Sequence, residues 1–215
     1  MERKVVGIFD FGITGGGNNS GFESLLYING VPFQGVDANH KEVFLRKEWI
    51  GEKIEMTFRL WSGLEGGGIK REQEHRINRA DLAFLDEKVD DFYYTAKVIL
   101  ETIAILQESA PQRIVLQKIL NQSMEQIDWS YPGSDSFYQS IYSACSYLKN
   151  QIEEMGKNPL VHMICIGHTH IDVAWLWRLK HTREKIARSF STVLRLMEQY
   201  PEYIFFKHNL NCMNI

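Results

Sequence analysis

The sequence has no long apolar run, no excess of basic residues and only three cysteines, and each shortage excludes a class of protein. Its apolar stretches stay far below the roughly 18 residues that indicate a membrane-spanning helix. The 24 Lys and Arg are outnumbered by 27 Asp and Glu, giving a net charge of −3, so nucleic-acid binding is not expected. We expect no secretory signal, because Glu2, Arg3 and Lys4 are not followed by a long apolar stretch or a cleavage site of small residues. We therefore expect a cytoplasmic protein without disulfides, in which three thiols are inert: Cys145, Cys165 and Cys212.

Residues 1–87 are predicted to form a β-rich amino-terminal domain. Asn29-Gly30 lies between two apolar runs, which is the strongest short signal for a β-hairpin. Three further segments have the composition or alternation of strands, namely Lys4–Phe9, Val43–Leu45 and Lys53–Leu60, with Ile54, Met56, Phe58 and Leu60 on one face.

Residues 88–157 are predicted to form a helical linker domain, because apolar residues recur there at spacings of three and four. Pro111 divides the first helix from the second, and Ser134 is a candidate N-cap of the third. The stripes expected to form the core are Val89, Phe92, Ala96, Ile99, Ile103 and Leu106; then Val115, Ile119 and Met124; then Phe137, Ile141, Ala144, Cys145, Leu148 and Ile152.

Residues 158–215 are predicted to begin an α/β barrel, so the fold class is α+β with an incomplete barrel at the end. Val161–Gly167 suits a buried strand, and Tyr203–Phe206 suits a second one. The helix between them would pack outside a parallel sheet. Its apolar face comprises Ile186, Phe190, Val193, Leu194 and Met197, and its arginines point away from that face: Arg183, Arg188 and Arg195.

The chemistry of the chain is concentrated between Gly167 and Trp177. If the first strand continues, His168, His170 and Asp172 lie on one face, since strand side chains alternate. Imidazole and carboxylate are ligands that zinc accepts, and the carboxyl ends of strands are where α/β proteins bind ligands. A simpler interpretation is that a histidine satisfies the backbone and Asp172 caps a helix.

Two tryptophans follow the histidines and allow two interpretations. Trp175 or Trp177 could present an aromatic plane to the apolar face of a sugar ring. Both could equally be core residues, since aromatic side chains bury large areas.

The Gly167–Trp177 motif and the sequence after it resemble the catalytic domain of glycoside hydrolase family 38 α-mannosidases, in the cytosolic, vacuolar and bacterial subgroup. The resemblance covers roughly residues 161–206 and includes Thr182–Lys185, Ala187–Phe190 and Leu196–Tyr203. It implies that His170 and Asp172 are two ligands of one zinc ion and that Trp175 binds substrate. His168 matches a position that is not counted as a ligand.

The resemblance further implies hydrolysis of terminal α-mannosyl residues of oligosaccharides by a retaining mechanism that uses two carboxyl groups. The nucleophile, the acid/base and the remaining zinc ligand are expected beyond residue 215, and the tail from Lys207 departs from the family pattern. We therefore expect a truncated chain that is inactive alone. Without a closed barrel, residues 161–215 should be poorly ordered unless they swap or form a homo-oligomer. An amidohydrolase-like metal hydrolase and a non-catalytic remnant are the alternatives.

Overall fold

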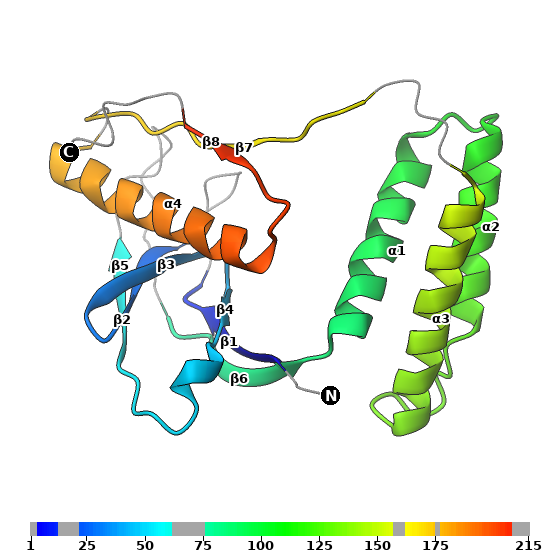
Figure 1. Cartoon of the computed structure of the whole chain (residues 1–215), viewed down its shortest axis with the longest axis horizontal. Helices are drawn as coiled ribbons and strands as arrows, with labels where there is room; N and C mark the ends of the chain where they lie inside the picture. Colours follow the sequence, from blue (N-terminus) through cyan, green and yellow to red (C-terminus); the bar gives the residue numbers. More distant parts are fainter. Residues whose placement is uncertain (1–3, 13–21, 62–75, 157–161, 175–176, 208–215) are drawn as a thin grey trace. The chain divides into compact units, whose positions relative to one another are not determined.

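The computed structural model describes residues 4–12, 22–61, 76–156, 162–174 and 177–207 (Figure 1). The chain divides into two compact units. One is helical and comprises residues 84–162 with the first four residues; the other joins residues 5–83 to residues 163–215. The division into three successive domains stays a prediction, but the contacts place the amino-terminal strands and the carboxyl-terminal segment in one unit.

The amino-terminal part of the second unit consists of two three-stranded sheets. The strand orders are β4-β1-β6 and β3-β2-β5, and β2 pairs antiparallel with both β3 and β5. The three strands predicted from composition are found as β1, β4 and β5, whereas β6 was not predicted because its residues are mostly exposed and alternate poorly. The bounds are β1 (Lys4–Asp10), β2 (Glu23–Ile28), β3 (Val31–Asp37), β4 (Glu42–Phe44), the short helix η1 (Lys47–Trp49), β5 (Met56–Trp61) and β6 (Arg79–Leu85).

The predicted hairpin at Asn29-Gly30 is confirmed. Asn29 has φ 50° and Gly30 has φ 80°, the two positive values that a two-residue turn between twisted antiparallel strands requires. This turn sets the register of β2 on β3, in which Ile28 lies opposite Val31.

Aromatic side chains fill the space between the sheets. The rings of Phe9 and Phe58 lie 4.6 Å apart, and Phe11 meets Phe22 edge to face at 5.2 Å. Leu60, predicted to lie on the same face of the strand as Phe58, is exposed. The buried cluster comprises Phe9, Phe11, Phe22, Leu26, Ile28, Phe33, Val36 and Val43.

The helical unit contains the three predicted helices, α1 (Glu87–Ile105), α2 (Pro111–Glu125) and α3 (Asp135–Glu154). Their starts follow from local chemistry. The carboxylate of Asp86 accepts two backbone N–H groups at the start of α1, Pro111 occupies the first turn of α2, and the hydroxyl of Ser134 accepts the N–H of Phe137 at 3.2 Å. The predicted N-cap is thus confirmed.

The core of the helical unit matches the predicted stripes of α1 and α3 and, of the predicted α2 stripe, contains Ile119. Val115 and Met124 are exposed, so their assignment to the core was wrong. The buried face of α2 contains Leu116, Ile119 and Leu120. This face is rotated by about one residue from the predicted one, because α2 packs against both α1 and α3. Burial raises the pKa of the Cys145 thiol, consistent with an inert cysteine; Cys165 is exposed, and Cys212 lies outside the described residues.

The carboxyl-terminal segment forms a βαβ unit from β7 (Gly167–His168), α4 (Leu179–Gln199) and β8 (Phe205–Phe206), with the two short strands parallel. The predicted strand–helix–strand order is confirmed. The predicted buried strand Val161–Gly167 is wrong, because Met163 and Ile164 are 81% and 80% exposed. A parallel strand is buried when other elements cover both its faces, and among the described residues only β8 pairs with β7. The rest of a barrel is not seen in the described residues.

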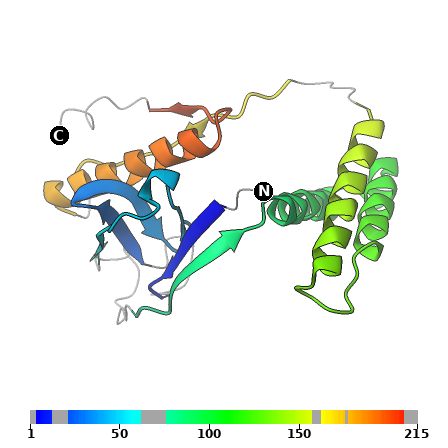
Figure 2. The same cartoon turned by 60° about the horizontal axis from the view of Figure 1, so that its bottom comes forward.

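Helix α4 packs on the face of β2 and β3, between that sheet and the β7–β8 pair (Figures 1 and 2). The side of α4 that faces the sheet is the basic one, and the side chain of Arg188 is only 11% exposed. The arginines of this helix were predicted to point away from its packed face. The apolar stripe turns to β8 instead, where Phe190 meets Phe205, and Leu194 and Met197 stay exposed. The expected poor order of residues 161–215 in solution stays a prediction.

A glycine permits the close approach of α4 to the sheet. The N–H of Gly35 in β3 donates to the hydroxyl of Thr192 at 2.9 Å, and a Cβ at Gly35 would collide with that same hydroxyl. The contact therefore requires both the absence of a side chain on β3 and a small hydroxyl residue on α4.

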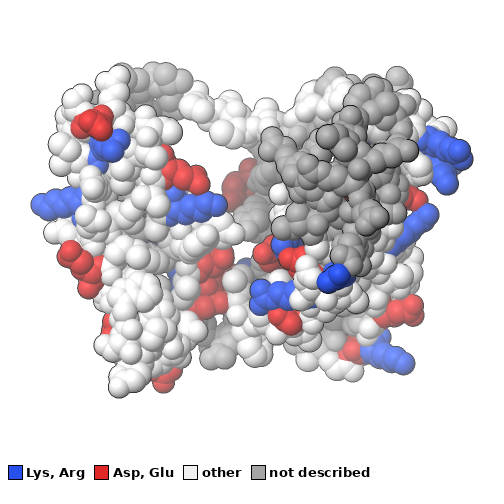
Figure 3. Space-filling view, turned by 180° about the vertical axis from the view of Figure 1, so that it is seen from behind, with Lys and Arg blue, Asp and Glu red and all other residues white. Residues whose placement is uncertain are grey.

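The surface carries charges of both signs without a continuous field of one sign on the face that Figure 3 shows. No helix in the described ranges combines the length and the apolar character needed to cross a membrane. Both observations agree with the near-neutral composition.

The helical core supplies a stability test. Leu148 in α3 is fully buried among the three helices, so Leu148→Ala should lower the free energy of unfolding of this unit by about 2–5 kcal/mol. Urea denaturation followed by far-ultraviolet circular dichroism measures it. Leu100→Ala, on the exposed side of α1, is the matched control and should change little. Equal effects of the two variants would contradict this packing.

Candidate functional site

The structure brings His170 and Asp172 into contact. The Nε2 atom of His170 lies 2.9 Å from a carboxylate oxygen of Asp172, as the sequence predicted, but not through strand alternation, since β7 ends at His168. Asp172 does not cap a helix: α4 begins seven residues later, after Arg178. Both side chains are accessible, with 63% and 45% of their surfaces exposed.

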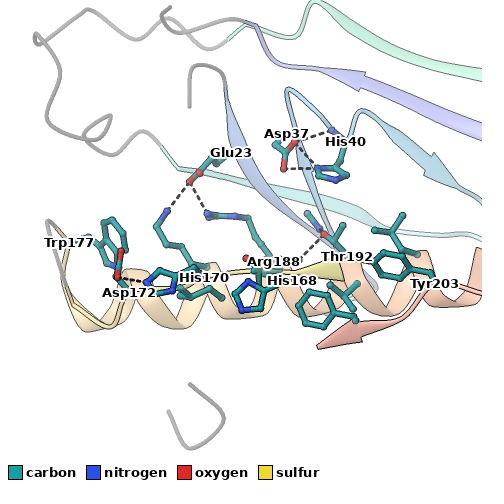
Figure 4. A pocket seen from close by; sticks show the side chains of 18 residues that line it. Glu23, Asp37, His40, His168, His170, Asp172, Trp177, Arg188, Thr192 and Tyr203 are labelled. Atoms are coloured by element: carbon teal, nitrogen blue, oxygen red, sulfur yellow. Dashed lines mark hydrogen bonds and ion pairs between the residues drawn. The ribbon is translucent and has the colours of Figure 1, made fainter. Parts of the chain in front are cut away.

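These two residues line a cavity of about 500 Å³ between the β7–α4 segment and the edge of the β2–β3 sheet (Figure 4). His168 lines the same cavity, so all three polar residues of the motif face one space. The sequence did not predict that the opposite wall comes from the amino-terminal strands and the turn after them, which contribute Glu23, Gly35, Asp37 and His40.

Trp177 is fixed at the end of the cavity next to Asp172 (Figure 4). Its indole N–H donates to the hydroxyl of Thr182 at 3.0 Å, and the ammonium group of Lys185 lies 4.6 Å from the ring centroid. Thr182 is fully buried, and its hydroxyl also accepts a hydrogen bond from the N–H of Ala174 at 3.1 Å. Ala174 has a φ of 53°, which is unusual for a residue other than glycine. One hydroxyl thus contacts both Ala174 and Trp177. Trp175, predicted to bind substrate, lies outside the described residues.

Glu23 connects the strand wall of the cavity to α4. Its carboxylate accepts a hydrogen bond from Arg188 at 2.7 Å and lies 3.7 Å from the ammonium group of Lys185. Burial lowers the pKa of Lys185, and neighbouring Arg188 lowers it further while Glu23 opposes the shift. No sequence signal indicated this group, because Glu23 and Arg188 are 165 positions apart.

Asp37 and His40 form a second imidazole–carboxylate pair on the strand wall. The Nδ1 atom of His40 lies 2.9 Å from the carboxylate, which also accepts the N–H groups of Asn39 and His40. The hydrogen bond to Asp37 raises the pKa of His40 above 6.5. Burial alone would raise the pKa of Asp37, but the hydrogen bonds from His40 and the turn outweigh it and hold that pKa below 3.8.

The donor set at His170 and Asp172 fits a zinc ion in chemistry. An imidazole nitrogen and a carboxylate oxygen lie close together on an accessible cavity wall, which is how two ligands of an open zinc site are arranged. The described residues contain no group of three or more His, Cys, Asp or Glu that could hold a metal. The role of His170 and Asp172 as zinc ligands stays a prediction.

Comparisons with known proteins point to one enzyme family. The family described as "Glycosyl hydrolases family 38 N-terminal domain" matches residues 160–214, which include the whole β7–α4–β8 unit and continue beyond Lys207, where the sequence was expected to depart. The chain is 27% identical over 196 residues to human Alpha-mannosidase 2C1, covering 85% of this chain and 18% of that protein.

Two further relatives agree with that match. Alpha-mannosidase G of Dictyostelium discoideum is 24% identical over 207 residues, covering 87% of this chain and 18% of the relative. An Alpha-mannosidase of Saccharomyces cerevisiae is 40% identical over 72 residues, covering 33% of this chain and 6% of the relative. The chain thus spans less than a fifth of the length of the curated relatives that it matches.

The Glu23 group generates a prediction about α4. Glu23→Gln removes the charge that compensates Arg188, so the free energy of unfolding of this unit should fall by about 1.5–3 kcal/mol. Amide hydrogen exchange should accelerate along α4 and β2 first. Glu52→Gln, at an exposed position of the same unit, is the control. Unchanged exchange in α4 would show that this ion pair does not hold the helix on the sheet.

The Asp37–His40 pair generates a prediction about pH. The raised pKa of His40 contributes stability that is complete below pH 6.5 and is lost as the pH rises through the folded-state value. The lowered pKa of Asp37 contributes stability that is complete above pH 3.8 and is lost as the pH falls through its folded-state value. The free energy of unfolding of the wild type should therefore exceed that of His40→Ala by the largest amount between these two pH values. A difference that stays constant above pH 6.5 would contradict the pairing.

Proposed function

We propose that the chain provides part of the active site of a zinc-dependent, retaining α-mannosidase, because residues 160–214 match the N-terminal domain of glycosyl hydrolase family 38. The substrate is a mannose-containing oligosaccharide from which a terminal α-mannosyl residue is hydrolysed. The observation that carries the proposal is the contact between His170 and Asp172 inside the region that matches the family.

His170 and Asp172 would hold the zinc ion. When bound, zinc supplies positive charge that orients and polarises hydroxyl groups of the terminal mannose. The two side chains lie 2.9 Å apart and both line the cavity. His168 lines the same cavity and is assigned no ligand role.

The aromatic and basic residues beside the pair suit a sugar. Trp177 presents an indole ring that Thr182 and Lys185 hold in place, and the C–H face of a pyranose packs well on such a surface. Trp175 is proposed as the residue beneath the mannose on the strength of the family resemblance.

The described residues do not complete a catalytic site. A catalytic zinc usually has three protein ligands, and no such group is present in the described ranges. A retaining mechanism also needs two carboxyl groups about 5 Å apart on either side of the glycosidic bond. We therefore propose that the 215-residue chain has no hydrolytic activity alone and that the missing groups come from another polypeptide segment.

Both alternatives remain testable. An amidohydrolase-like enzyme would also use a His-x-His sequence at a strand end, but the match over residues 160–214 favours the mannosidase. A non-catalytic remnant would keep the fold and lose zinc binding. The scarcity of cysteine supports a reducing, cytoplasmic setting.

Activity on an aryl α-mannoside tests the function. The chain alone should be inactive with and without zinc. A chimera in which the chain replaces the matching segment of the human relative should hydrolyse the mannoside, and a chelator should abolish that activity. His170→Ala in the chimera should reduce kcat/KM by at least about 100-fold, because it removes a ligand of the zinc ion.

The matched control is His162→Ala, which changes an exposed histidine outside the cavity. Hydrolysis by the chain alone would overturn the proposed incompleteness. A chimera that folds, as judged by its melting temperature and circular dichroism, yet cleaves no mannoside would overturn the proposed function of this segment.

A further inference from the structure

The cavity extends beyond the residues that would hold one mannose. His170, Asp172 and Trp177 gather at one end, while Asp37 and His40 lie on the wall formed by the amino-terminal strands (Figure 4). Its volume of about 500 Å³ falls in the range of ~300–1,000 Å³ that accommodates ligands larger than a monosaccharide. The second wall therefore has room to contact a further part of the substrate.

His40 is oriented for such a contact. Its Nδ1 atom is engaged by the carboxylate of Asp37 at 2.9 Å, and Asp37 is itself fixed by the N–H groups of Asn39 and His40. The ring orientation is thereby set, and the opposite nitrogen, Nε2, is the edge that can meet a ligand. The side chain of His40 is 44% exposed, so a ligand in the cavity can reach it.

The charges of the cavity favour a neutral ligand with many hydroxyl groups. The two cations of α4 that line the cavity, Lys185 and Arg188, are both engaged by Glu23, and an anion would also meet the carboxylates of Asp37 and Asp172. A metal at the strand wall lacks ligands, since the described residues contain no group of three suitable side chains. A sugar hydroxyl, which donates and accepts hydrogen bonds, matches an oriented imidazole.

We propose that His40, positioned by Asp37, contacts the second sugar unit of an α-linked oligosaccharide whose terminal mannose lies at His170 and Asp172. This inference rests on the proposed function and adds the amino-terminal strands to substrate recognition. His40 is a specificity-determining residue: it contributes to disaccharide binding and contributes nothing to monosaccharide binding.

Side-chain ¹H–¹⁵N correlation spectra of the histidines in the full 215-residue chain provide the test. Methyl α-mannoside should shift the signals of His168 and His170 only. A set of methyl α-mannobiosides, one for each linkage, should with at least one linkage shift His40 as well. The exposed His162, which does not line the cavity, should not respond to either sugar.

Substitutions supply a second readout. His40→Ala should weaken binding of the responding mannobioside by about two- to tenfold, the effect of losing one hydrogen bond, and leave binding of methyl α-mannoside unchanged. His40→Gln, which keeps a donor and an acceptor, should restore part of the loss. His162→Ala is the matched control, and backbone spectra confirm that each variant is folded.

The outcomes separate this inference from the proposed function. If methyl α-mannoside shifts the signal of His170 but no mannobioside shifts the signal of His40, the role of His40 is overturned and the mannosidase proposal stays intact. If His40→Ala weakens the binding of methyl α-mannoside and of the mannobioside equally, His40 has a structural role and the inference is also overturned. If no sugar shifts any histidine signal, the cavity does not bind sugars and the inference is overturned. The mannosidase proposal is tested separately, by the hydrolytic activity of the chimera.

Discussion

The second unit depends on the docking of α4 onto the amino-terminal sheet. The helix presents a polar face to β2 and β3, where Arg188 meets Glu23 and Thr192 meets the backbone of Gly35. Taking an arginine out of water is costly unless its charge is compensated, so Glu23 makes this packing tolerable. The opposite, apolar face of α4 is then free to pack against β8, where Phe190 meets Phe205. One helix thereby joins two segments more than 100 residues apart in the sequence.

The candidate site is a consequence of that docking. The β7–α4 segment carries His170 and Asp172 to one side of the cavity, and the sheet to which α4 is held supplies Asp37 and His40 on the other. Thr182, buried at the start of α4, accepts the indole N–H of Trp177. The geometry of the site therefore relies on contacts made outside it, and loosening α4 would separate the two walls. Among the described residues, the helical unit contributes nothing to the lining of this cavity.

The match to the family 38 model and the geometry point to the same residues. The family match begins at residue 160 and includes the whole β7–α4–β8 unit, and within it the structure joins the imidazole and carboxylate that the motif singled out. The relatives are about five times longer than the segment they share with this chain. Beside this contact lie exposed apolar residues, among them Met163 and Ile164.

Local patterns were sufficient for much of the secondary structure. The Asn29-Gly30 hairpin, the three helices and the Ser134 cap depend on backbone preferences and on side chains a few residues away. Such local preferences can be predicted from the sequence. The His170–Asp172 contact also follows from proximity along the chain. The errors were about packing: the buried face of α2, the exposed run at residues 162–166 and the inward basic face of α4. Periodicity identifies an apolar stripe, but it cannot say which partner covers it or whether a charged face finds a counter-ion 165 positions away. The sequence thus determined the elements and the chemistry of the motif, whereas the tertiary structure decided the cavity, because its second wall exists only where distant strands meet α4.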